Sequence, residues 1–284
     1  MKVFWSILLG LLVLGSALTG CGHNVAGSDQ LLQDAVIELK SGHKKEFEEK
    51  LNASIRSISQ DDAAQRTWVE KAAGYVEELR KEGKATEAKE LLEYDIALTD
   101  NLWGKYDIVT KGLREKLIVA CGDMQDWSGA EAALDEILKD PEKQGDSGDL
   151  GSESDLTKAR RIIRTGEYFE NHDQIEGAER LYRRGLTLLE ERMKGASKST
   201  NGTDILGLWA IARAQADLGT LLSRGAEKPD GDELLKAASA SAKDAKAAEA
   251  AATKESAPEM LLRDEMGFSK DKARVEKLLG TAAK

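Results

Sequence analysis

The sequence predicts an all-α protein, and a helix pair that recurs along it predicts a solenoid of stacked helical hairpins. Three observations lead to the all-α prediction. Alanine, leucine, glutamate and lysine are abundant, while only 5% of the 284 residues are aromatic and only three are proline, a balance that favours helices. Apolar residues recur at spacings of three and four, which marks one face of a helix. Runs of alternating β-branched residues, typical of strands, are missing from the sequence.

Composition and charge narrow the class of protein. The chain is 41% hydrophobic and 32% charged, which is typical of a folded body. Its formal net charge of −10 argues against nonspecific nucleic-acid binding, which relies on a basic surface, so we expect no nucleic-acid partner. A basic cluster on an expected helix is interpreted as a solvated face, with an anion site as the alternative. Its members are Lys158, Arg160, Arg161 and Arg164.

The first 20 residues are predicted to be a lipoprotein signal peptide. Lys2 supplies a positive charge, and Val3–Leu14 is an apolar stretch too short for a membrane span of about 20 residues. Leu18-Thr19-Gly20-Cys21 resembles the cleavage motif of bacterial lipoproteins. The resemblance implies that Cys21 becomes the first residue and carries lipid, a diacylglycerol on its thiol and a further acyl chain, such as palmitate, on its amine. An ordinary signal peptide or an uncleaved anchor is the alternative.

This lipid would place the protein at a membrane. Two or more acyl chains anchor a protein stably, whereas one chain holds it only marginally. Gly22, where some lipoproteins carry an aspartate that resembles an inner-membrane retention signal, favours the outer membrane. We expect a lipid anchor on the extracytoplasmic side of the bacterial cell membrane or outer membrane, with residues 21–28 as a tether.

Residues 29–60 are predicted to form an N-terminal helical hairpin. One apolar stripe runs through Leu31–Leu39 and a second through Phe47–Ile55, with a turn at Ser41–His43 between them. His43 is interpreted as a turn residue, because no second histidine or cysteine follows at the spacing of a metal site. The sequence thus indicates two antiparallel helices.

Residues 61–256 are predicted to form a series of helix pairs. Asp61 and Asp62 can cap the first helix, because a carboxylate accepts hydrogen bonds from the free amides of a first turn. The polar stretches 143–155 and 195–202 are interpreted as loops. The apolar stripes of the expected helices are Trp68–Leu79, Ala88–Ala97, Ile108–Cys121, Trp127–Leu138, Leu156–Asn171, Ile175–Met193, Leu206–Leu222 and Leu234–Ala242.

The C-terminal part carries weaker signals. The alanine-rich stretch Ser239–Lys254 favours a helix but offers few large apolar side chains to bury. Residues 257–284 are predicted to form two short helices, near Glu259–Glu265 and Lys270–Leu279. Ser269 can cap the second of these helices.

A repeat runs through the expected second helices of the pairs. A small residue near the start of each recurs at intervals of 42, 48 and 53 residues, and a large residue follows four positions later. An apolar or small residue follows seven positions later, with Asp95 as the exception. The small residues are Ala88, Ala130, Ala178 and Gly231; the large ones are Leu92, Leu134, Tyr182 and Leu235; the third set is Ile137, Gly185 and Ala238.

This pattern resembles the tetratricopeptide repeat (TPR), and the segment Glu176–Leu186 resembles the second helix of the repeats in kinesin light chains. By the same resemblance Gly166 and Gly219 match the small contact residue of the first helix. No repeat has the full set, and the spacings exceed the usual 34 residues. The other matches are Phe169 and Leu222 with the late aromatic residue, and Pro141 with the terminal proline.

Residues for chemistry or binding are sparse. The sequence holds no HExxH, GxSxG, P-loop or GxGxxG motif, so we predict no catalytic residue, metal site or cofactor, and no enzymatic activity. The TPR resemblance implies a concave face lined by the first helices of the repeats. Charged residues expected on that face are the candidates for binding a partner: Arg80, Glu115, Arg160, Glu167, Glu170 and Arg213, together with Glu70 and Glu77.

These expectations favour a membrane-anchored scaffold that binds another cell-envelope protein or peptide in an assembly or adaptor role. Two alternatives stay open. The first is a helical envelope enzyme without a recognisable motif, and the second is a structural spacer with no specific groove. The identity of the partner and the oligomeric state do not follow from the sequence.

Overall fold

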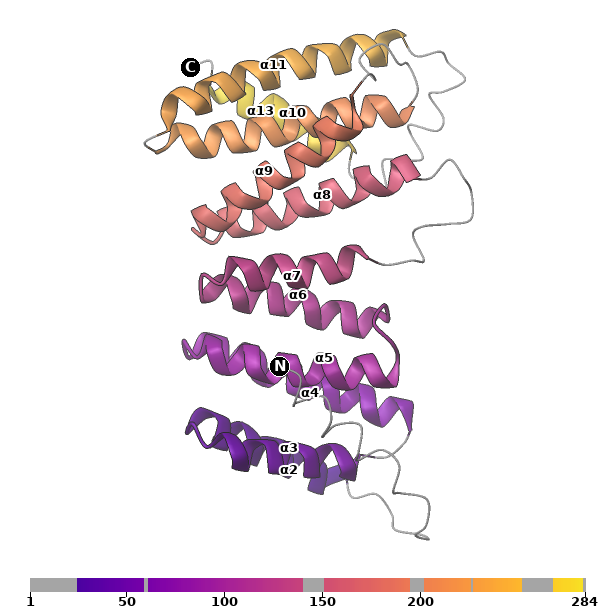
Figure 1. Ribbon diagram of the computed structural model, residues 1–284, viewed down its shortest axis with the longest axis vertical. Helices are drawn as coiled ribbons and strands as arrows, with labels where there is room; N and C mark the ends of the chain where they lie inside the picture. The colour runs from indigo at the N-terminus through magenta and orange to yellow at the C-terminus, as the bar shows by residue number, and fades with distance from the viewer. Residues whose placement is uncertain are drawn as a thin grey trace. The chain divides into compact units, whose positions relative to one another are not determined.

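The computed structural model describes residues 25–58, 61–139, 151–194, 202–225, 227–251 and 268–282. Every regular element in these ranges is an α-helix, which confirms the all-α prediction for them (Figure 1). The helices are α2 (Val25–Lys40), α3 (Lys44–Ser57), α4 (Asp62–Lys81), α5 (Ala85–Leu102), α6 (Ile108–Asp123), α7 (Trp127–Leu138), α8 (Gly151–Glu170), α9 (Ile175–Arg192), α10 (Gly202–Ser223), α11 (Lys228–Ala251) and α13 (Phe268–Ala282).

The chain forms two compact units, Met1–Leu91 and Leu92–Lys284. In the first unit, α2 and α3 pair as a hairpin where the sequence predicts one. A short hydrogen-bond chain adds α4 to this pair: Trp68 Nε1 donates to Ser54 Oγ (2.9 Å), and Ser54 Oγ donates to the Ser28 carbonyl (2.6 Å). Helix α2 starts at Val25, so it includes the last residues of the expected tether. All three helices therefore meet at one buried polar point in an otherwise apolar core.

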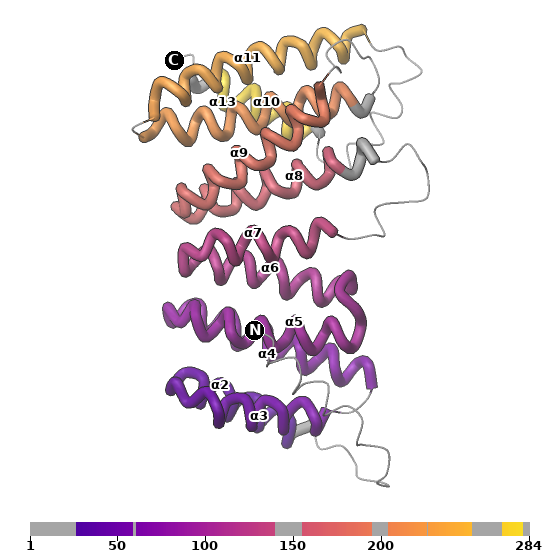
Figure 2. Tube along the Cα trace, in the orientation of Figure 1, coloured from indigo at the N-terminus to yellow at the C-terminus, as the bar shows by residue number. Residues whose placement is uncertain are grey.

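The second unit contains three hairpins, α6–α7, α8–α9 and α10–α11, which stack in chain order (Figure 2). Trp127 of α7 and Phe169 of α8 meet edge to face with their ring centroids 5.6 Å apart. The next hairpin is added where α10 packs against α8 and α9. A hairpin cannot bury its apolar face alone, so this stacking produces one continuous core, in which Trp209 and Tyr182 are fully buried.

Small residues occupy the closest helix contacts of two hairpins, as the repeat pattern predicts. A methyl group added at Gly166 would lie 2.9 Å from the ring of Tyr182, and one added at Gly219 would lie 2.9 Å from the carbonyl oxygen of Gly231. A real side chain at either position would force the two helices apart. The glycines therefore set how closely α8 packs on α9 and α10 on α11.

The C-terminal helices differ from expectation. Helix α11 is continuous from Lys228 to Ala251, and Pro229 lies in its first turn, where its missing amide is not needed. Ala242 and Ala245 are buried, although this stretch is expected to bury little, because small side chains let a neighbouring helix approach closely. Helix α13 is also longer than the predicted Lys270–Leu279.

Some expectations fall outside the described residues. These are the signal peptide, the lipidated Cys21, the terminal Pro141 and the predicted helix at Glu259–Glu265. Within the described ranges, no helix has both the length and the hydropathy that a membrane crossing requires.

Candidate protein-interaction surface

Four of the six candidate residues meet in the second unit. Arg160, Glu167 and Glu170 lie on α8, and Arg213 lies on α10. Helix α13 is the third helix at this place, and its Asp271 accepts hydrogen bonds from both Arg160 and Arg213. Arg160 Nη2 is 2.5 Å from Asp271 Oδ2, and Arg213 donates to the other oxygen of the same carboxylate. One aspartate of α13 thus connects the first helices of two consecutive hairpins.

Arg274, one turn further along α13, contacts the acidic side chains on the same surface. Its Nε donates to Asp217 Oδ1 of α10 (2.6 Å), and its Nη1 is 3.0 Å from Glu167 Oε1. Arg213 also donates to Asp217 (3.2 Å) and to Glu167. We call these side chains the α8–α10–α13 ion network: Arg160, Glu167, Glu170, Arg213, Asp217, Asp271 and Arg274.

Most of this network is removed from water. The exposed fraction of the side chain is 0% for Asp217, 4% for Asp271, 6% for Arg213 and 8% for Arg160. Burying a charge is costly unless oppositely charged partners replace the lost hydration. Because each buried charge here has at least one such partner, the network specifies how α13 lies on α8 and α10.

The pKa shifts follow from the same competition between burial and charge. Burial raises the pKa of Asp217, while the adjacent Arg274 and Arg213 favour its charged form. Burial acts to lower the pKa of Arg213, but the carboxylates of Asp271 and Asp217 outweigh it and hold this pKa above its usual value. Burial lowers the pKa of Arg160, which is less fully surrounded by acids. Removal of α13 would thus leave Arg160 and Arg213 without Asp271 as a partner.

Tyr182 connects the packing pattern to the network. It is the large residue of the repeat whose second helix is α9, and its hydroxyl donates to Glu170 Oε2 (2.8 Å). Burial raises its pKa above the usual value, so the hydroxyl stays protonated. Arg224 binds the other oxygen of Glu170 (3.1 Å) from the exposed side. Glu170 is therefore held by both a core residue and a surface residue.

The two remaining candidates lie elsewhere. Arg80 pairs with Glu77 (2.9 Å) on α4 of the first unit. Glu115 on α6 pairs with Arg161 on α8 (2.8 Å), and both side chains of this pair are exposed. The structure thus brings four of the six residues together, and partner binding by any of them stays a prediction.

Sequence reasoning missed three members of the network: Asp217, Asp271 and Arg274. A signal for Asp217 does exist, because it follows Arg213 by four residues in a helix that is otherwise almost wholly buried. An acid and a base on the same face of such a helix are expected to pair. The two residues of α13 give no comparable local signal, since their partners are far away in the sequence.

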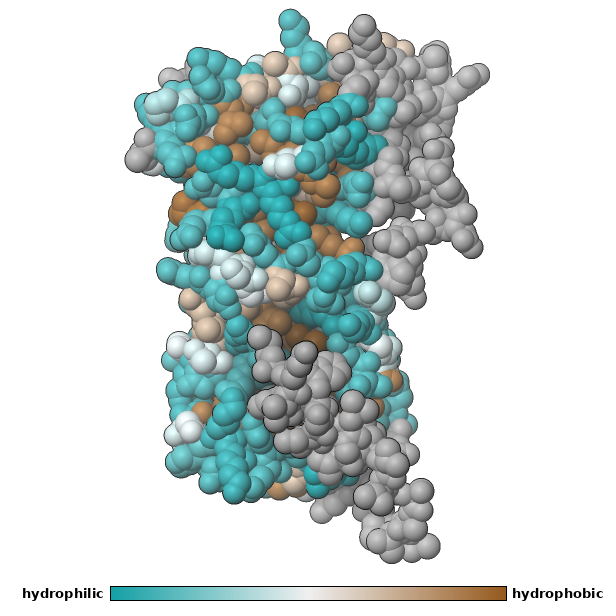
Figure 3. Space-filling model, viewed as in Figure 1, coloured by the Kyte–Doolittle hydropathy of each residue, from teal (hydrophilic) through white to brown (hydrophobic). Residues whose placement is uncertain are grey.

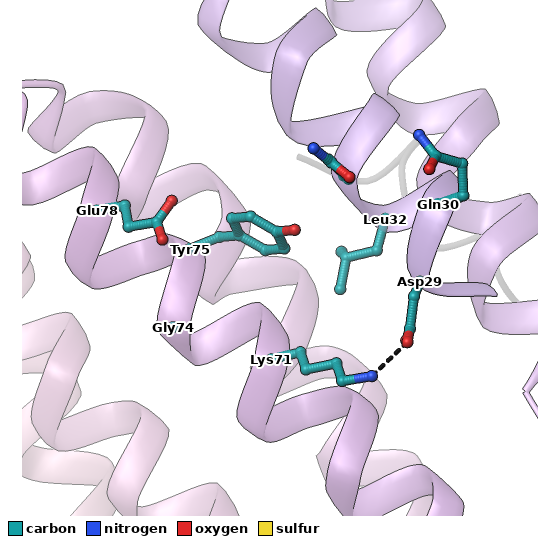
Figure 4. A pocket seen from close by; sticks show the side chains of 8 residues that line it. Asp29, Gln30, Leu32, Lys71, Gly74, Tyr75 and Glu78 are labelled. Atoms are coloured by element: carbon teal, nitrogen blue, oxygen red, sulfur yellow. Dashed lines mark hydrogen bonds and ion pairs between the residues drawn. The ribbon is translucent and has the colours of Figure 1, made fainter. Parts of the chain in front are cut away.

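Each unit also has a shallow hollow. In the first unit, a hollow of about 520 Å³ lies between α2 and α4. Tyr75 and Leu32 point toward one another across it, and Lys71 pairs with Asp29 at its edge (Figure 4). Burial raises the pKa of Tyr75.

In the second unit, a hollow of about 560 Å³ lies between α7, α8 and α9, lined by charged and aliphatic side chains including Asp135, Arg184 and Ile162.

The surface and the described polar side chains have three further properties. The face in view in Figure 3 is mainly hydrophilic, with apolar residues between the charged ones. Among the described residues, no three histidine, cysteine or acidic side chains are grouped so that they could hold a metal ion. Cys121 is buried in the core, as its position in a helix stripe predicts. The charged side chains of the α8–α10–α13 ion network pair with one another.

Comparisons with known proteins find similarity to solved structures. No family model and no curated protein matches the chain. The chain is similar to the crystal structure of a kinesin light chain of Podosopora anserina with nearly identical TPR-like repeats, and to a point variant of that protein. For each, the identity is 15%, the match covers 78% of this chain and 97% of the other, and the TM-score is 0.35.

Proposed function

We propose that this protein is a membrane-anchored scaffold with TPR-like repeats that binds another cell-envelope protein or peptide. The observation that supports it most is the stack of three hairpins in the second unit. Stacked hairpins present a long surface built from successive first helices, and repeat proteins use such surfaces to hold extended partners. In this proposal the chain performs no chemistry of its own.

The charge pattern favours a polypeptide partner of mixed charge. The first helices α6, α8 and α10 carry both acids and arginines, among them Glu115, Glu167 and Arg213. Complementary charges across an interface select the right partner and fix its register more than they add affinity. A peptide or protein segment with alternating acids and bases would match this surface better than a uniformly charged polymer.

Membrane anchoring is proposed from the cleavage motif that ends in Cys21. The lipid would hold the helical body at the extracytoplasmic side of the cell membrane or the outer membrane. A scaffold confined to that surface meets its partners in two dimensions, which raises its effective concentration toward them.

Crosslinking in the native host, followed by mass spectrometry, tests the proposal. We expect a small, reproducible set of envelope proteins crosslinked to residues of the second unit. The matched control is an unrelated lipoprotein expressed at the same level. A set of proteins no different from that of the control would contradict the scaffold function and would favour a structural spacer.

A further inference from the structure

Helix α13 occupies the surface that the repeat pattern assigns to a partner. It lies against α10 and α11 and reaches α8 through Asp271. Two residues of α13, Asp271 and Arg274, account for its contacts with the four candidate residues on α8 and α10. The chain thus places its own last described helix over the charged surface of its last two hairpins.

The contact of α13 is specific in its charges and poor in apolar burial. Among residues 269–280, Asp271 and Val275 are buried, and Leu279 packs partly buried against the core. The hydrophobic effect, which drives most stable helix packing, therefore acts here through only two aliphatic side chains, Val275 and Leu279. Buried ion pairs roughly offset their own desolvation cost, so they fix geometry without adding much stability. Such a helix is held in a defined place but is exchangeable.

One polar group in the contact is left without a partner. Arg160 Nε is buried, and no acceptor among the described residues reaches it. The Asp271 carboxylate contacts only the Nη2 of the same guanidinium. An acidic side chain positioned to accept from both nitrogens would satisfy Arg160 more fully, since guanidinium groups bind carboxylates best through two parallel hydrogen bonds.

We propose that the α8–α10 surface is a docking site for a partner helix, and that α13 occupies it in the free protein. The proposal rests on the scaffold function and names the partner by its chemistry. The partner is a helix that carries an acidic residue, an arginine three positions later and an aliphatic residue directly after the arginine. This is the spacing of Asp271, Arg274 and Val275 in α13. The acid faces Arg160 and Arg213, and the arginine faces Asp217 and Glu167.

The covalent connection between α11 and α13 makes α13 a competitor for that site. Ala251 ends α11 and Phe268 begins α13, so 16 residues connect them. A covalently linked segment has a high effective concentration at its own site, and a separate helix binds only if it fits better or if α13 is weakened. The free protein therefore keeps the site closed, and a matching partner opens it.

A fluorescent peptide with the sequence of residues 268–282 tests this on the full-length chain. The release variant is the double substitution Asp271→Arg and Arg274→Glu, which reverses both charges and keeps the net charge. We expect it to bind the peptide about tenfold or more tightly than the unchanged protein does. The control reverses one exposed charge of the same helix, Lys277→Glu, and leaves Glu276 unchanged because Glu276 pairs with Lys246 of α11. It should bind the peptide as weakly as the unchanged protein does.

Equal peptide affinity of the release variant and the unchanged protein would overturn the proposal. Hydrogen exchange of the unchanged protein keeps the test valid if the release variant misfolds. We expect amides of α13 to exchange faster than those of α8 and α10, and identical rates would show that α13 is a fixed part of the core.

Two further outcomes separate this proposal from the general function. A dimer of the unchanged protein in light scattering would mean that α13 exchanges between copies, which contradicts a separate partner. Envelope proteins crosslinked only to other surfaces would leave the scaffold function standing and would refute this site.

Discussion

At the scale of single residues, Asp95 breaks the repeat. The equivalent positions of the other repeats hold Ile137, Gly185 and Ala238. Asp95 is 1% exposed, and no hydrogen-bond partner for either of its carboxylate oxygens is found in the described part of the chain. Burial raises its pKa well above the usual value near 3.8. Burial therefore favours the protonated, uncharged form of Asp95 in the folded chain.

We expect Asp95→Ala to raise the free energy of unfolding at pH 7 by about 1–3 kcal/mol, since a buried polar group without a partner costs that much. The folded pKa is raised, so the stability of the unchanged protein falls as pH rises from about 4 through the folded pKa. The gain from the substitution should therefore shrink towards pH 4. Urea unfolding of both proteins at pH 7 and about pH 4 measures this gain in the free energy of unfolding. A gain independent of pH would contradict the prediction.

Close helix contacts give a second prediction at this scale. An added methyl group at Gly231 would lie 2.6 Å from the backbone nitrogen of Ser223 and 2.7 Å from the carbonyl oxygen of Gly219. Backbone must move to make room, so Gly231→Ala should destabilise the fold by about 1–3 kcal/mol. Gly74→Ala is the control: nothing lies within 4 Å, and alanine favours a helix by about 1 kcal/mol. Thermal unfolding should move in opposite directions for the two variants.

At the scale of the helices, local chemistry decides where each one starts. Three helices begin after an aspartate whose side chain accepts a hydrogen bond from a first-turn amide: Asp61, Asp107 and Asp126. Turns before other helices use the left-handed backbone conformation that glycine adopts readily, as at Gly42 and Gly83, with φ of 76° and 75°. The start of each of these helices therefore depends on residues that are close to it in the sequence.

We expect Asp61→Ala to lower the free energy of unfolding by about 1 kcal/mol, because the amide of Ala64 loses its acceptor. Asp61→Asn keeps an acceptor oxygen at the same place and should lower the free energy of unfolding by only a few tenths of 1 kcal/mol. Denaturant midpoints of the three proteins provide the measurement. Similar losses for alanine and asparagine would show that charge, and not the cap, is responsible.

At the scale of the whole molecule, the proposed lipid anchor at Cys21 would place the helical body at a membrane. We expect Cys21→Ser to abolish incorporation of radiolabelled palmitate and to release the protein from the membrane fraction, because the hydroxyl cannot take the thioether-linked diacylglycerol. Cys121→Ser is the control, since Cys121 is buried in a helix and should not affect labelling. Palmitate still entering the Cys21→Ser protein would refute the cleavage motif.

The candidate surface was predictable only in part. Arg160, Glu167, Glu170 and Arg213 follow from the register of the repeats, because the small residues Gly166 and Gly219 mark which helix faces are in contact. The register does not reveal that α13 covers these residues. It also treats Arg80 and Glu115 as equivalent to them, although their partners are Glu77 and Arg161.

The sequence by itself determined most of the helices, their turns and the small residues at which they touch, because helical periodicity and capping act within a few residues. The start of α8 at Gly151, inside the expected loop 143–155, is an exception. Only the tertiary structure decided which charges meet. Arg160 and Asp271 are 111 residues apart, and no local rule connects them. Their pairing depends on how α8, α10 and α13 are packed, and this packing turns a predicted open surface into one that the chain itself occupies.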